Sequence, residues 1–60
     1  MQPNQVVKFK APADADEAQE RFKVLEDRGE RVLVEGLIGF DEWQVKPTFV
    51  YQVDELEASE

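Results

Sequence analysis

Three stretches of the chain carry the residue pattern of β-strands. The first spans residues 5–11, where apolar and polar residues alternate from Val7 on, the period expected of a strand with one buried face. The stretches 31–40 and 48–53 are rich in β-branched and aromatic residues, which favour strands. The ends of the chain, residues 1–4 and 57–60, lack such a pattern and are predicted to be frayed.

The segment between the first two of these strands predicts a helix over residues 14–28. Apolar residues recur in it at helical spacing, on one stripe. Asp14 suits the N-cap position, and Glu17 follows three residues later, as in a capping box. Gly29 comes directly after the segment and suits the left-handed position that ends a helix.

The predicted order is therefore strand, helix, strand, strand within one domain spanning residues 1–60. We expect an α+β fold of the βαββ type, a three-stranded sheet with the helix packed on one face. A single helix covers only one face, so apolar residues out of phase with the core are left on the other face. We predict that this face mediates self-association, which would stabilise so small a domain, through Val6, Leu33, Leu37 and Val50.

The composition narrows the classes of function. The chain has no Cys and no His, so a disulfide, a thiolate metal site and a conventional catalytic triad are excluded. We predict no catalytic, cofactor-binding or metal-binding residue and expect that the protein is not an enzyme. The sequence lacks both a signal peptide and a run of roughly 20 apolar residues that would span a membrane, so we expect a cytoplasmic protein without membrane contact.

The charge indicates the kind of partner. There are 14 acidic and 7 basic residues, giving a net charge of −7, which opposes direct nucleic-acid binding and favours a basic protein surface. Acidic residues concentrate after residue 40, and we predict partner contacts by Asp41, Glu42, Asp54 and Glu55. Trp43 is predicted either to anchor the partner or to close one end of the core.

Three functions remain open from the sequence. The first is a small regulator or inhibitor that binds a basic partner, such as a nucleic-acid-binding protein, as a partial mimic of nucleic acid. The second is a homodimeric structural or accessory subunit whose acidic surface serves solubility only. The third is a dimeric DNA-binding β-ribbon that uses Lys8 and Lys10. The layout of a basic strand, a capped acidic helix and a hairpin resembles, in architecture only, small phage- and plasmid-encoded inhibitors of host enzymes. That resemblance implies the first function.

Overall fold

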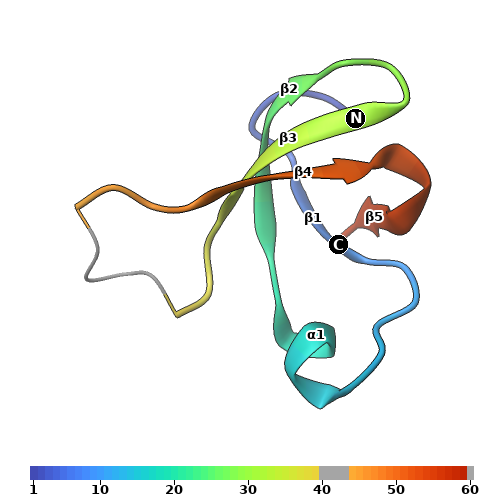
Figure 1. Ribbon diagram of the computed structural model, residues 1–60, viewed down its shortest axis with the longest axis vertical. Helices are drawn as coiled ribbons and strands as arrows, with labels where there is room; N and C mark the ends of the chain where they lie inside the picture. Colours follow the sequence, from blue (N-terminus) through green and yellow to red (C-terminus); the bar gives the residue numbers. More distant parts are fainter. Residues whose placement is uncertain (40–43, 60) are drawn as a thin grey trace.

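The protein is a five-stranded antiparallel sheet, in strand order β4-β3-β2-β1-β5, with one short α-helix among the described residues (Figure 1). The computed structural model describes residues 1–39 and 44–59. A single turn of 3-10 helix, η1, separates the last two strands. The elements are β1 (Val6–Phe9), α1 (Ala15–Gln19), β2 (Phe22–Asp27), β3 (Arg31–Gly36), β4 (Thr48–Gln52), η1 (Val53–Glu55) and β5 (Leu56–Ala58).

The predicted fold class, an α+β domain with a helix packed on a three-stranded sheet, is wrong. The helix predicted over residues 14–28 ends at Gln19, and its second half is β2. The predicted N-cap is present, because the Asp14 carboxylate accepts a hydrogen bond from the Glu17 N–H at 2.8 Å. The predicted start of the helix is therefore confirmed, and its predicted length is wrong.

The strand replaces the helix because β2 has a partner on each side. It pairs antiparallel with both β1 and β3, so its backbone groups are used along both edges. Phe22 and Val24 are buried while Lys23 between them is half-buried, which is the period of a strand. Gly29 has a positive φ of 92°, as predicted for it, but it forms the β2–β3 hairpin turn instead of a helix end. Its N–H donates to the Asp27 carboxylate at 2.8 Å.

The C-terminal part of the chain also differs from the prediction. The strand predicted over 31–40 ends at Gly36, and Glu57 and Ala58, within the segment predicted to fray, belong to β5. β5 pairs with β1, where Leu56 lies opposite Phe9 and is buried. The resemblance to phage and plasmid inhibitors depended on the βαββ layout, so the fold no longer supports it.

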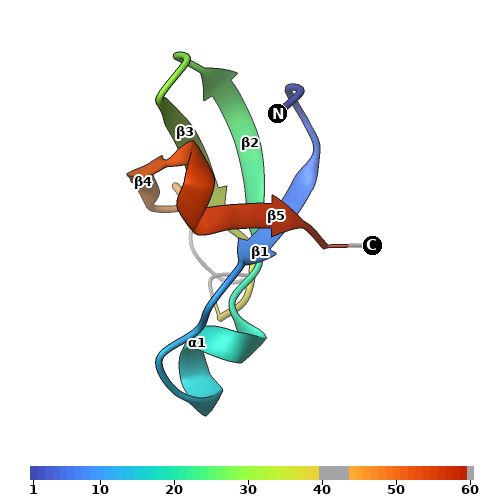
Figure 2. The same cartoon turned by 90° about the vertical axis from the view of Figure 1, so that its right-hand side faces the viewer.

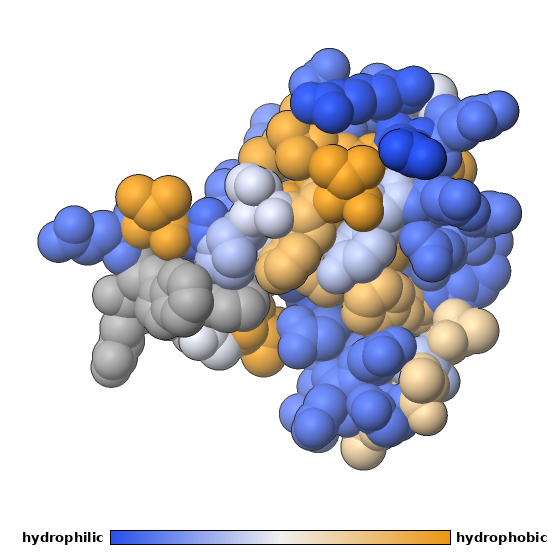
Figure 3. Space-filling view, in the orientation of Figure 1, coloured by the Kyte–Doolittle hydropathy of each residue, from blue (hydrophilic) through white to orange (hydrophobic). Residues whose placement is uncertain are grey.

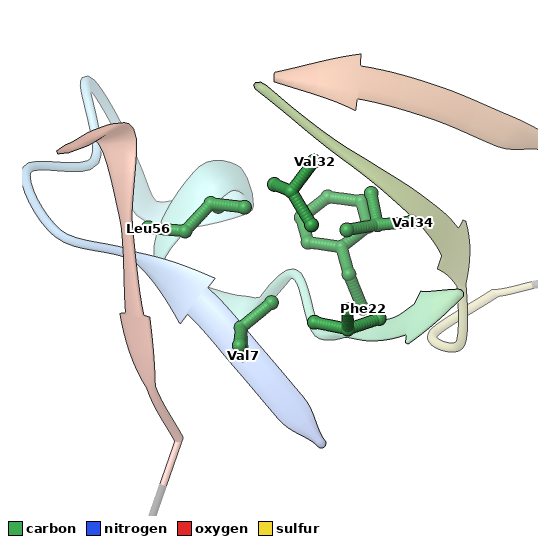
Figure 4. Packing of buried hydrophobic residues seen from close by; sticks show 6 residues of the cluster. Val7, Phe22, Val32, Val34 and Leu56 are labelled. Atoms are coloured by element: carbon green, nitrogen blue, oxygen red, sulfur yellow. The ribbon is translucent and has the colours of Figure 1, made fainter. Parts of the chain in front are cut away.

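The sheet curls so that its inner face becomes the core. The rings of Phe9 on β1 and Tyr51 on β4 have centroids 5.3 Å apart, although their strands are three positions apart, which is about 14 Å in a flat sheet. A register shift between Val24 and Glu26 marks a bulge that bends β2, and Figure 2 shows this curvature. The buried side chains point toward one another from four strands (Figure 4): Val7, Phe22, Val24, Val32, Val34 and Leu56.

Candidate functional site: an aromatic hollow with an acidic rim

Aromatic side chains from three strands gather on the inner face beside the buried valines. The ring of Phe22 packs edge-to-face against those of Phe9, Phe49 and Tyr51, with centroids 5.3 to 5.9 Å apart. Phe22 is buried, but the other three rings are only half-buried. They border an open cavity of about 250 Å³, which we call the aromatic hollow; it is lined by Phe9, Glu17, Glu20, Phe22, Phe49 and Tyr51.

Two of the residues that line the hollow are acidic and come from α1 and the residue that follows it. The Glu17 carboxylate accepts a hydrogen bond from the Ala13 N–H at 3.2 Å, which ties the start of α1. Behind the helix, the Arg21 guanidinium donates to the carbonyls of Ala18 at 2.9 Å and Glu20 at 2.7 Å. The helical turn is thus held at both ends, and it carries Glu17 and Glu20 to the edge of the rings.

A third acidic residue reaches the same place from η1. The Glu55 carboxylate accepts a hydrogen bond from the Gln52 N–H at 2.9 Å, which fixes its position. Glu55 and Asp54 line a second cavity that shares Phe9 and Glu17 with the aromatic hollow. We call Glu17, Glu20 and Glu55 the acidic rim. Figure 3 shows hydrophobic side chains in the middle of this face, surrounded by hydrophilic ones.

The charges of the rim act on the rings. The pKa of the Tyr51 phenol is raised above its ordinary value of 10.0, first by partial loss of solvent and then by the negative charges of Glu20, Glu55 and Glu17. All three carboxylates therefore contribute to the potential at this ring. Ring faces and carboxylates both attract a cation, so the hollow is suited to a Lys or Arg side chain.

The structure places only part of the predicted partner site. Asp54 and Glu55 are exposed on η1, beside the aromatic hollow. Asp41, Glu42 and Trp43 lie outside the described residues, so both predictions for Trp43, anchor or core, stay predictions.

The residues predicted for self-association do not form one patch. Leu33 and Val50 lie directly opposite each other on β3 and β4, and Val50 is 47% exposed. Val6 lies on β1 opposite Lys23, so β2 separates it from Leu33. Leu37 follows the end of β3, where its N–H donates to the Arg21 carbonyl at 3.0 Å. The register therefore joins Leu33 with Val50 and leaves the other two apart.

Sequence reasoning missed the aromatic hollow as a site. Four of the chain's six aromatic residues line it, since the chain has four Phe, one Trp and one Tyr. The alternation of Phe49 and Tyr51 along one strand was a usable signal, but it indicated a core face. The sequence indicates Glu55 as a partner contact but does not place it near Glu17 and Glu20, which are far from it in the sequence and approach it only when the sheet curls.

Comparisons of the chain with models of protein families, with curated proteins and with solved structures find no match. Within residues 1–39 and 44–59, no group of three or more acidic side chains is arranged to hold a metal ion. A helix with the length and apolar composition needed to cross a membrane is not found in the described part of the chain. The function is therefore argued from the aromatic hollow itself.

Proposed function

We propose that this protein is a small non-enzymatic regulator or inhibitor that binds a basic segment of a protein partner at the aromatic hollow. The observation that supports this most is the set of three carboxylates around half-exposed aromatic rings. A cation on the partner gains from the ring faces and from the rim charges at once. The net charge of −7 adds long-range attraction that speeds association with a basic surface.

A nucleic-acid-binding groove is one basic surface that fits this proposal. There the acidic rim would stand in for part of a phosphate backbone, and the aromatic rings would take the place of stacked bases. The proposal includes a cytoplasmic location, which is consistent with the absence of Cys.

A homodimeric accessory subunit is the second candidate function. The cross-strand pair of Leu33 and Val50 on the outer face of the sheet favours it. Sedimentation at high micromolar concentration distinguishes the two candidate functions. A stable monomer would reject the homodimeric accessory subunit and would leave the regulator or inhibitor unaffected.

The test of the first proposal is a binding titration with a short basic peptide, acetyl-Ala-Arg-Ala-Arg-Ala-amide, called the Arg peptide below. Its control replaces both Arg residues by citrulline, which keeps the planar shape and removes the charge. We expect the Arg peptide to bind more tightly than the citrulline peptide. The difference should shrink as salt rises from about 50 mM to about 300 mM, because the Debye length shortens over that range.

The matched protein variants change the same number of charges in two places. Glu17→Gln with Glu20→Gln removes two charges of the acidic rim and should weaken binding of the Arg peptide about tenfold at low salt. Glu26→Gln with Glu35→Gln removes two charges on the outer face and should leave binding nearly unchanged. Equal weakening by both pairs would show that only net charge matters and would reject the hollow as the site.

A further inference from the structure

One edge of the sheet is open along β4. This strand is first in the strand order and pairs with β3 only. The Gln52 N–H points away from β3, because it donates to the Glu55 carboxylate, whereas the next N–H, of Val53, reaches the Glu30 carbonyl across the hairpin. N–H direction alternates along a strand. The backbone groups of Thr48 and Val50 therefore point out of the sheet, to the side where no strand lies among the described residues.

The composition of β4 leaves this edge unprotected. Edge strands are usually blunted by charged residues, by Pro or by short length. The stretch Thr48–Gln52 has no charged residue and four β-branched or aromatic residues in a row, Thr48 to Tyr51. The opposite edge strand, β5, is only three residues long and carries Glu57. Of the two edges, β4 is the one prepared to accept another strand.

The inner face of β4 connects this edge with the aromatic hollow. Phe49 and Tyr51 point to the inner face and line the hollow, while Val50 between them points outward. A strand added to the edge would place the residues opposite Phe49 and Tyr51 on the same inner face, with Cβ atoms about 4.5–5.5 Å away. Those side chains would lie beside the rings and within reach of the acidic rim.

We infer that the β4 edge pairs antiparallel with an extended segment of the partner in which every second residue is Arg or Lys. The inference rests on the proposed function and adds that the recognised segment is a strand. Antiparallel pairing continues the pattern of the whole sheet. The acidic rim beside the edge selects a basic occupant, and the net charge of −7 disfavours a second copy of this chain.

The backbone of the Arg peptide tests the pairing. Val50 presents both its N–H and its C=O to the added strand, so the peptide residue opposite it makes two hydrogen bonds. With the Arg side chains on the inner face, that residue is an Ala, and the Arg N–H groups point away from β4. N-methylation of the Ala residues should therefore weaken binding at least about tenfold, whereas N-methylation of the Arg residues should change it by less than about twofold.

The protein offers a matching pair of variants. Val50→Pro removes an N–H that faces away from β3, so the existing ladder is kept and proline is tolerated there. Val50→Pro should weaken binding of the Arg peptide as N-methylation of its Ala residues does. Val50→Thr keeps the N–H and should bind the peptide as the wild type does. On the wild-type protein, the peptide should slow hydrogen exchange at the amides of Thr48 and Val50, a readout that needs no variant to fold.

The outcomes separate this inference from the proposed function. Suppose that the Arg peptide binds, and that N-methylation of the Ala residues does not weaken its binding. Antiparallel edge pairing is then overturned, whether or not N-methylation of the Arg residues weakens binding. The proposal that the protein binds a basic segment still stands. Unchanged exchange at Thr48 and Val50 in the bound state overturns it in the same way. If the Arg peptide binds no better than its citrulline control, the proposed function is rejected, and the inference that rests on it is rejected as well.

Discussion

Two sets of side chains on the inner face of the sheet differ in their burial. Val7, Val24, Val32 and Val34 are 0% exposed and close the core. The rings that line the aromatic hollow are larger and two of them lie directly opposite these valines, Phe49 opposite Val34 and Tyr51 opposite Val32, yet three of the four rings remain half-buried. Burial of apolar area is the main source of stability. The three half-buried rings keep apolar area open to solvent, and the proposed function assigns that area to contact with the partner.

The acidic rim strengthens this contrast. Among the described residues, the ion pairs join the Met1 ammonium with Asp27 and Glu26 with Arg28, and both lie away from the rim. Glu17, Glu20 and Glu55 take part in neither of these ion pairs, and Lys10 lines the cavity that Glu17 and Glu55 share. The buried valines stabilise the fold, and the half-buried rings with their acidic rim are the part that the proposed function assigns to binding.

The largest expected effect is on the cluster of buried side chains. Leu56→Ala removes a side chain that is 2% exposed and packs against the valines, so it should lower the free energy of unfolding by about 2–5 kcal/mol. A control, Val50→Ala, truncates an exposed side chain on the outer face and should have a far smaller effect. Urea unfolding measures both. A Leu56→Ala protein that melts like the wild type would show that β5 is not part of the core.

A smaller effect is expected at the aromatic hollow, in the titration of Tyr51. The rim charges raise the pKa of its phenol, so Glu20→Gln should move the ultraviolet titration of Tyr51 to lower pH. Glu35→Gln, on the outer face, is the control and should leave it in place. Titration midpoints that are the same in wild type and Glu20→Gln would show that the Glu20 carboxylate does not raise the pKa of the Tyr51 phenol.

The raised pKa of Tyr51 also sets the sign of a stability change. The folded state holds the phenol proton to higher pH than the unfolded chain does. Its contribution to stability is therefore complete below pH 10, the ordinary value of the phenol pKa, and is lost as the pH rises above it. The Glu20→Gln variant should lose less stability over that alkaline range than the wild type.

The sequence predicted the parts of the fold that depend on local pattern. Residues 5–11 and 48–53 alternate and lie largely in strands, and Asp14 caps a helix where the capping signal places it. The segment around Phe22 fits both periods, since Phe22 and Leu25 suit a helix whereas Phe22 and Val24 suit a strand. Pairing with β1 and β3 decides between them, and this information is not local.

The candidate site was less accessible to prediction than the fold. The acidic bias of the chain and the positions Asp54 and Glu55 could be read from the sequence. The aromatic hollow could not, because it joins Phe9 on β1 with Tyr51 on β4 through the curl of the sheet. That curl depends on a bulge in β2, a strand that the sequence pattern assigned to a helix.

The most direct test of the central claim, that the aromatic hollow binds a basic segment, is a nuclear magnetic resonance titration of the wild-type protein with the Arg peptide. We expect the ring signals of Phe9, Phe49 and Tyr51 to shift together and saturate with a single affinity, and the citrulline peptide to leave them nearly unchanged. Shifts confined to the outer face, at Leu33 and Glu35, or no charge-dependent shift in the rings would contradict the account.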